Sequence, residues 1–201
     1  MPKVTAQYLD DRRNQILDAA RTCFARNGFH ATSMQDLFTE SGLSAGAVYR
    51  YFPSKAEMVL AIAEENMRDV VATVRDAAEA TDPARPQDAQ SIGDVLARIY
   101  ELIAARNADT GLAGMAVVVW GEGLRDPALG EGLAALLDET RRSFAVAVAT
   151  QQRLGRVTDA VPPEAVAAVA VATVPGFLLQ LALGGPEAVA GFGPAARALW
   201  P

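Results

Sequence analysis

Apolar residues recur at the spacing of an α-helix along most of this chain. The clearest case lies within residues 12–25, where four apolar side chains fall on one helical face: Ile16, Ala20, Cys23 and Phe24. Alanine, the residue with the highest helix propensity, fills 40 of the 201 positions, whereas alternating runs of β-branched and aromatic residues are scarce. The sequence therefore predicts an all-α protein that is long enough to bury a proper core, and it disfavours a large sheet.

Capping residues and helix breakers divide the N-terminal part into short helices. Ser33 is followed by Asp36 three residues later, which is a capping box, and Gly42 ends the helix that begins there. Ser44 is suited to cap a second segment that runs to about Phe52. The sequence thus predicts two short helices joined by a tight turn around Gly42.

A long helix and a larger helical body are predicted beyond these two helices. Ser54 and Glu57 form another capping box, which opens a long helix that runs toward Ala80. Residues 82–90 contain two prolines among small polar residues and are the predicted connection between head and body. Glycine and proline then separate five further predicted helices, at residues 92–105, 111–124, 129–154, 163–183 and 186–199.

Residues 165–186 carry no charged side chain, and an uncharged run of this length by itself fits a membrane-spanning helix. The run is mostly alanine and valine, is interrupted by polar and helix-breaking residues, and lacks flanking basic or aromatic anchors. These features favour a helix buried on two faces by neighbours, such as a second subunit, and no membrane is expected as a partner.

Charge and cysteine content narrow the class of protein. The formal net charge is −6, and residues 1–60 hold seven Lys and Arg against six Asp and Glu, so +1 in this segment leaves −7 for the remainder. This asymmetry fits a small nucleic-acid-facing segment on an acidic body. One cysteine allows no internal disulfide, and one Cys with one His makes no zinc site. The N-terminal residues have no signal-peptide pattern, so we expect a cytoplasmic protein. No metal or cofactor is expected.

Two short helices around a glycine turn are typical of a helix-turn-helix, whose second helix enters the major groove of DNA. Residues 44–55, with the sequence SAGAVYRYFPSK, resemble the recognition segment of TetR-family transcriptional regulators. Preceding residues resemble the same family at positions 16–20, 24, 28–29, 32–33 and 41–44. Phe38 departs from the small residue usual there, a change that bears on how the two helices pack.

The resemblance covers roughly residues 10–70 and implies an all-α fold with two parts. A three-helix DNA-binding head is expected at residues 10–70, with the helix-turn-helix at about residues 33–52. A helical ligand-binding and dimerisation body is expected at residues 71–201. The resemblance implies a homodimer formed by the helices at residues 129–154 and 163–183.

The chemistry of DNA contact points to particular residues in the head. Hydroxyls and free N–H groups at helix N-termini suit phosphates, Gly46 permits a close approach of the backbone, and tyrosine hydroxyls and lysine reach phosphates. Arg50 is the expected base reader, through guanine, with phosphate contact as its alternative, and two alanines are suited to touch a thymine methyl. The expected DNA-binding residues are Thr32, Ser33, Ser44, Ala45, Gly46, Ala47, Tyr49, Arg50, Tyr51 and Lys55.

Each of these residues also has a structural alternative. The serines can simply cap helices, Tyr49 can belong to the core, and Arg50 can be a solvated surface charge. In the body, five side chains are candidates to line an apolar effector pocket, although sparse aromatics at helical spacing are more often core: Tyr100, Met115, Trp120, Phe144 and Phe177.

The sequence favours a regulator, and specifically a repressor, released from palindromic double-stranded operator DNA by an apolar small-molecule effector. An enzyme is disfavoured because one His and one Cys leave little for nucleophilic catalysis and no glycine-rich phosphate loop is present, so no catalytic residue is assigned. The remaining alternative is a helical small-molecule-binding protein without DNA function. The intact recognition segment argues against that alternative.

Overall fold

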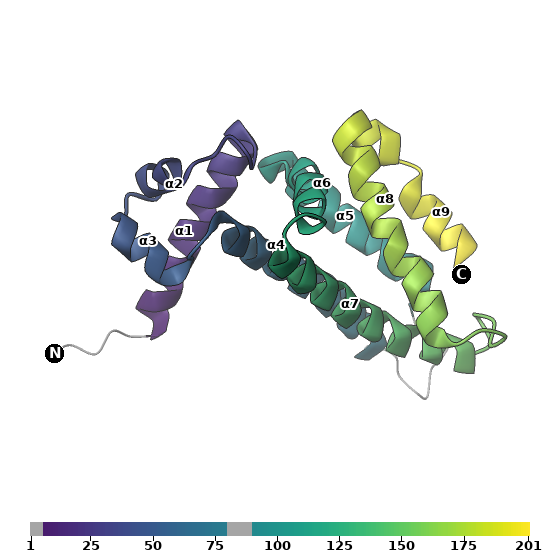
Figure 1. The fold of residues 1–201 in the computed structure, drawn as a ribbon. Helices are drawn as coiled ribbons and strands as arrows, with labels where there is room; N and C mark the ends of the chain where they lie inside the picture. Colours follow the sequence, from purple (N-terminus) through teal and green to yellow (C-terminus); the bar gives the residue numbers. More distant parts are fainter. Residues whose placement is uncertain (1–5, 80–89) are drawn as a thin grey trace.

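The structure, a computed structural model, describes residues 6–79 and 90–201. Within these ranges the chain forms nine helices and no strand, which confirms the predicted all-α class. The connection predicted at residues 82–90 lies, apart from Gln90, outside the described residues. Figure 1 shows a small head that contains the N-terminal helices and a larger body that ends at the C-terminus.

Three helices form the head: α1 (Ala6–Asn27), α2 (Met34–Ser41) and α3 (Ala45–Tyr51). The capping box predicted at the start of α2 is present, since the Asp36 N–H donates to Ser33 Oγ (3.2 Å) and the Ser33 N–H donates to Asp36 Oδ2 (2.8 Å). Gly42 ends α2 with a φ of 65°, a left-handed conformation that glycine adopts at little cost. The predicted tight turn between two short helices is therefore confirmed.

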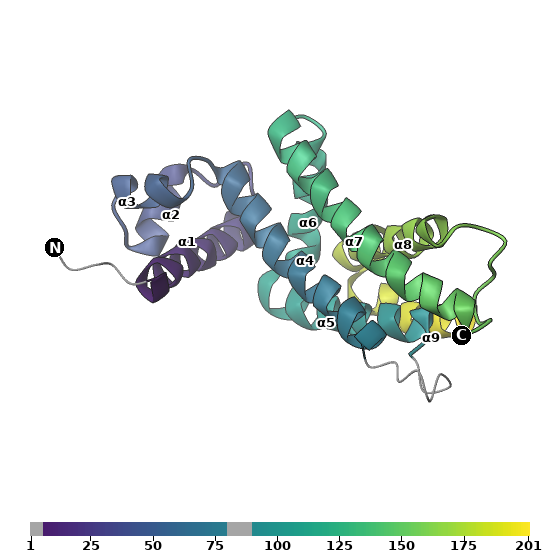
Figure 2. The ribbon, with the colours of Figure 1, turned by 90° about the horizontal axis from the view of Figure 1, so that it is seen from below.

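Helix α4 (Lys55–Glu79) begins in the head and continues along the body. Figure 2 shows α4 running beside α7 (Pro127–Arg153) for much of its length. The first half of α4 supplies Met58, Val59 and Ile62 to the head core, and its second half supplies Val70 and Val74 to the body core. One rigid element thus belongs to both cores.

The body contains α5 (Ile92–Thr110), α6 (Leu112–Gly123), α7, α8 (Pro163–Val189) and α9 (Phe192–Leu199). The helix predicted at residues 186–199 is wrong as a single element, because its first residues belong to the end of α8 and the rest form α9. Gly185, with φ 71° and ψ −170°, breaks the helical conformation inside α8 just before Pro186. The straight part of α8 therefore ends close to the predicted end at residue 183.

Helix α6 connects the body to the head. Val119 of α6 is buried in the same cluster as Ile16, Leu37 and Val48 of the head, and Met115 packs against it. At the end of α6, Glu122 lies 3.2 Å from His30 Nε2 in the loop that follows α1. The body therefore contacts the head through α6 as well as through α4.

Helix α8 is long and apolar enough to cross a membrane, and one face of it packs on the body while another is exposed. Ala170, Phe177 and Leu181 are buried, as expected for a core helix. The opposite stripe is exposed and apolar, and it recurs at helical spacing: Val169, Ala172, Leu179 and Leu183. The sequence predicted that neighbours cover both faces of this helix. In the single chain, the body covers one face and the other face is exposed.

Candidate nucleic-acid interface and ligand cavity

Helix α3 lies on the surface of the head and is fixed there by few residues. Val48 is fully buried and Phe52, at its C-terminal end, is 4% exposed, so these two side chains anchor the helix to the head core. Ser44 caps the helix by accepting a hydrogen bond from the Ala47 N–H (3.3 Å). The remaining surface of α3 is open to solvent.

The exposed surface of α3 carries most of the residues expected to contact DNA. Ser44, Ala45, Gly46, Tyr49 and Arg50 are exposed, and Ala47 is half-buried. Gly46 faces open space, because a Cβ built there would meet no neighbouring side chain or element within 4 Å. The structure thus brings these six residues together on one rigid element, as a groove-reading helix requires.

Two aromatic contacts orient the polar ends of this helix. The Tyr49 ring packs edge-on against Phe38 of α2, with centroids 5.4 Å apart, and its side chain remains 47% exposed. The large residue at position 38 therefore braces Tyr49 from the neighbouring helix. The Arg50 guanidinium lies over the Tyr51 ring at 5.3 Å, which restricts its freedom while leaving it at the surface.

Ser33 is exposed at the N-terminus of α2, but its polar groups already have a partner. The Ser33 hydroxyl donates to Asp36 Oδ2 (2.7 Å) in addition to the capping-box bonds. Hydrogen bonds from the Ser33 N–H and hydroxyl lower the pKa of Asp36, so this carboxylate stays ionised. A phosphate at this helix end meets a negative charge as well as the helix dipole.

Thr32 and Tyr51 do not present their hydroxyls to solvent. Thr32 is 1% exposed, and its hydroxyl contacts the backbone carbonyls of Gly28 (2.7 Å) and Cys23 (3.2 Å), which fastens the loop to the end of α1. The Tyr51 hydroxyl is buried and has no hydrogen-bond partner among the described residues. The phosphate contacts expected from these two hydroxyls do not match this geometry, because both point into the head.

Lys55, in the first turn of α4, ties down the loop between α1 and α2. Its ammonium donates to the carbonyl oxygens of Thr32 (2.6 Å) and Phe29 (2.8 Å) and lies 4.7 Å from the centre of the Phe29 ring. Burial lowers the pKa of Lys55, while Glu122 and Asp36 act in the opposite direction. The side chain expected to reach a phosphate is therefore engaged inside the head.

The body contains an apolar cavity of about 120 Å³ between α4, α5, α6, α7 and α8. Three of the five predicted pocket residues line it: Met115, Trp120 and Phe144. Tyr100 and Phe177 do not, because their rings stack on each other 4.7 Å apart and pack against Phe192 in the core beside α9. Burial raises the pKa of Tyr100, whose hydroxyl is 2.6 Å from that of Thr173.

The head and the cavity share residues. Val59 and Ile62 of α4 and Val119 of α6 are buried in the head core and also line the cavity. Periodicity in the sequence predicted α4 and α6 as helices, but it gave no signal that one face of each would serve both regions. The cavity is thus lined by side chains of the same buried cluster that contains Val48 of α3.

Residues 16–62 match the family model described as bacterial regulatory proteins, tetR family. Over these residues, the chain is similar to the TetR family. The matched residues include α2, α3 and the start of α4, which are the elements that present the exposed helix. The family consists of regulatory proteins, in agreement with the resemblance seen in the recognition segment.

Named relatives are similar to this chain over a limited length. YfiR, an uncharacterised helix-turn-helix regulator of Bacillus subtilis, is 48% identical over 66 residues, which are 33% of this chain and 32% of YfiR. The repressor Rv1474c of Mycobacterium tuberculosis is 39% identical over 72 residues, which are 36% of this chain and 38% of the relative. The chain thus matches only about a third of the length of these relatives.

Longer similarity extends into the body of this chain. UidR of Escherichia coli K12 is 26% identical over 152 residues, covering 76% of this chain and 70% of UidR. The structure of Salmonella enterica GusR superposes with a TM-score of 0.77 at 27% identity, covering 98% of this chain and 96% of GusR. FadR of Bacillus subtilis, solved with stearoyl-CoA, has a TM-score of 0.72 at 18% identity and covers 92% and 96% of the two chains, a likeness of fold.

Proposed function

We propose that this chain is a ligand-responsive transcriptional regulator, and specifically a repressor, that binds palindromic operator DNA as a homodimer. The observation that carries the proposal is the exposed surface of α3, held rigidly by Val48 and Phe52 on a TetR-type head. A surface helix with a small-residue N-terminal turn and an arginine one turn later fits the major groove. The cavity in the body supports a small-molecule effector.

In this proposal, the residues exposed on the head contact DNA directly and the buried ones support them. Arg50 reads a base, the alanines touch base edges, and hydroxyls and N–H groups hold phosphates. The direct contacts are Ser33, Ser44, Ala45, Gly46, Ala47, Tyr49 and Arg50. Thr32, Tyr51 and Lys55 contribute by holding the loop before α2 and the end of α3 in place.

The division into a DNA-binding part at residues 10–70 and a body at 71–201 is also proposed, with α4 crossing between them. Because Val59 and Ile62 face both the head core and the cavity, an effector that prefers one position of α4 shifts the head. Such a shift changes the distance between the two recognition helices of a dimer. The coupling needs only a difference in effector affinity between two positions of α4.

The alternative function, a ligand-binding protein without DNA function, accounts for the cavity but not for the exposed surface of α3. We favour the regulator for this reason and assign it no catalytic role. We also propose that this protein acts in the cytoplasm, where a bacterial transcriptional regulator meets its DNA. This is the location expected from the sequence.

Binding of arbitrary duplex DNA tests the proposed interface without knowledge of the operator. At low salt, non-specific affinity is high because counterions are released from the phosphates. We expect hydrogen–deuterium exchange to slow in peptides from residues 33–52 when duplex DNA is added, and to stay unchanged in α9. Protection confined to the body, or no protection at all, contradicts the proposal.

The exposed apolar stripe of α8 supports a homodimer, and its disruption is a direct test. Leu179 and Leu183 are 43% and 81% exposed, and Val146 adds a 64% exposed apolar side chain on α7, the helix that packs beside α8. We expect the double variant Leu179→Glu/Leu183→Glu to elute as a 21.2 kDa monomer in light scattering, whereas the wild type elutes at twice that mass. Leu124→Glu, at a residue that is 90% exposed just after the end of α6, is the control and is expected to stay dimeric. A monomeric wild type at micromolar concentration contradicts the dimer.

A further inference from the structure

The cavity in the body is apolar except at one edge. Among the described residues that line it, Arg106 of α5 is the one with a formal charge. Asn66 and Thr140 are uncharged polar residues, and the Thr140 hydroxyl already donates to the Leu136 carbonyl within α7 (2.9 Å). A ligand with a charged group therefore meets a single charged partner here, and that partner is a cation.

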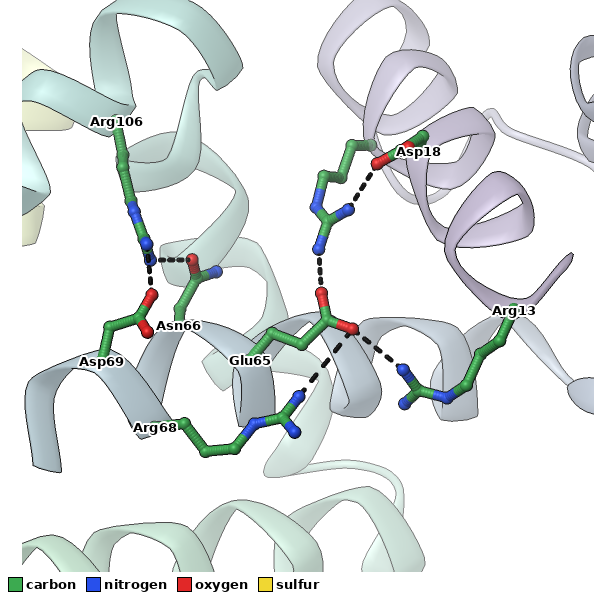
Figure 3. Close-up of polar contacts among 8 residues, drawn as sticks. Arg13, Asp18, Glu65, Asn66, Arg68, Asp69 and Arg106 are labelled. Carbon is green, nitrogen blue, oxygen red and sulfur yellow. Dashed lines mark hydrogen bonds and ion pairs between the residues drawn. The ribbon is translucent and has the colours of Figure 1, made fainter. Parts of the chain in front are cut away.

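Figure 3 shows how Arg106 reaches from α5 to α4. Its Nη1 donates to Asn66 Oδ1 (3.1 Å), and its Nη2 is ion-paired with Asp69. These two contacts use two of the five N–H donors of the guanidinium. The side chains of Arg106 and Asp69 are 36% and 47% exposed, so the pair stands at the border between the cavity and water.

Glu65, another carboxylate on this stretch of α4, is held elsewhere. Glu65 pairs with Arg13 and Arg21 of α1 and with Arg68 one turn along α4, as Figure 3 shows. Glu65 is thus committed to the head, and Asp69 is the carboxylate paired with Arg106. Asp69 is therefore the residue that neutralises the charge of Arg106 at the edge of the cavity. Because Asp69 is partly exposed, water can solvate its carboxylate when the ion pair separates.

We propose that the effector is a small amphiphilic carboxylate, whose apolar part fills the cavity and whose carboxylate takes the place of Asp69 on Arg106. This inference deepens the proposed function and rests on it. A guanidinium binds a carboxylate with two parallel hydrogen bonds, and the interaction is stronger beside an apolar wall than in open water. A cavity of about 120 Å³ is close to the size that holds a benzene ring, so the apolar part is small.

The exchange of Asp69 for a ligand also explains how binding reaches the head. The Arg106–Asp69 pair ties α4 to α5 of the body, whereas the Arg13 and Arg21 pairs with Glu65 tie α4 to α1 of the head. When a ligand carboxylate occupies Arg106, the ion pair with Asp69 is lost and the hydrogen bond to Asn66 remains, so the tie of α4 to the body is weakened while its tie to the head is unchanged. Helix α4 then moves with the head, which is the change that alters operator affinity.

Calorimetric titration with matched acids and amides tests the charge of the ligand. The probes are hexanoate, octanoate and phenylacetate, each compared with its own primary amide at pH 7.5 on the full-length protein. We expect at least one carboxylate to bind with a Kd below about 1 mM and about tenfold more tightly than its amide. Equal affinity of each acid and its amide, or no binding by any of the three acids, overturns the proposal.

Two substitutions separate recognition of the carboxylate from a structural role of the ion pair. Arg106→Gln is expected to weaken carboxylate binding about tenfold and to remove the preference over the amide. Asp69→Asn is expected to tighten carboxylate binding about threefold, because the competing anion is gone, and to leave the amide unchanged. If the pair only ties α4 to α5, both variants shift affinity in the same direction, which overturns the proposal. Arg98→Gln, an exposed residue of α5 outside the cavity, is the matched control.

Failure of this inference is distinguishable from failure of the proposed function. Protection of residues 33–52 by DNA, together with no preference for carboxylates, leaves the regulator intact and removes the ligand class. A preference for carboxylates without any DNA binding supports the cavity assignment and contradicts the regulator.

Discussion

Replacing Arg50 with alanine is expected to remove most of the preference for the correct base at one base pair of each operator half-site. The affinity for the operator then falls toward the affinity for a random duplex. A bidentate contact of arginine with guanine contributes about 1–3 kcal/mol of discrimination against the wrong base. Arg50 is the exposed arginine of α3, and its guanidinium is steadied over the Tyr51 ring. Fluorescence anisotropy with an operator and with the same duplex carrying one changed base pair measures this loss.

The control for Arg50 is an arginine far from α3. Arg98→Ala removes the same charge from an exposed site on α5 of the body and is expected to leave both affinities and their ratio unchanged. An equal loss of affinity for operator and random duplex in Arg50→Ala shows that Arg50 binds phosphate instead of a base.

Replacing Lys55 with methionine is expected to destabilise the head and to weaken DNA binding without regard to sequence. The ammonium satisfies backbone carbonyls of Phe29 and Thr32, and hydrogen bonds that involve a charged group contribute about 1.5–3 kcal/mol each. Because burial of Lys55 costs part of this gain, we expect a net loss of about 2 kcal/mol in the free energy of unfolding. Chemical denaturation followed by circular dichroism measures it.

DNA binding separates Lys55 from Arg50. Lys55→Met disturbs the loop that positions Ser33 and α2, so affinities for operator and random duplex are expected to fall by the same factor. Lys55→Arg keeps the charge but does not fit the carbonyl cage as a compact ammonium does, and it is expected to restore stability only in part. Unchanged stability with a selective loss of operator binding argues against this role.

Local signals in the sequence predicted the head well. Helix caps act through neighbours within four residues, so they can be predicted from the sequence alone. The caps in the head are Ser33 with Asp36, Gly42 with its positive φ, and Ser44. The positions of α3 expected to face DNA came instead from the resemblance of residues 44–55 to a recognition segment and from the chemistry of DNA contact, and five of them are exposed. Helix existence in the body was likewise predictable, apart from the break at Gly185 and the short α9.

Contacts between distant residues were not predictable in this way. Lys55 meets carbonyls 23 and 26 residues away, and Thr32 turns inward onto Cys23, so neither role is visible in a motif. Periodicity shows that Tyr100 and Phe177 face inward, but not whether they face the cavity or the packed core beside α9. Arg106 was missed altogether, because a single arginine on a helix gives no sign that its end lies at a cavity.

In the proposed function, one rigid helix in each subunit of a two-fold dimer reads DNA. Selection of binding sites from a random duplex library by the purified protein, at a stated salt concentration, tests this arrangement. We expect an inverted repeat whose half-sites are related by the two-fold axis and separated by about one helical turn of DNA or a multiple of it. Recovery of no consensus, with only weak and salt-sensitive binding, contradicts it.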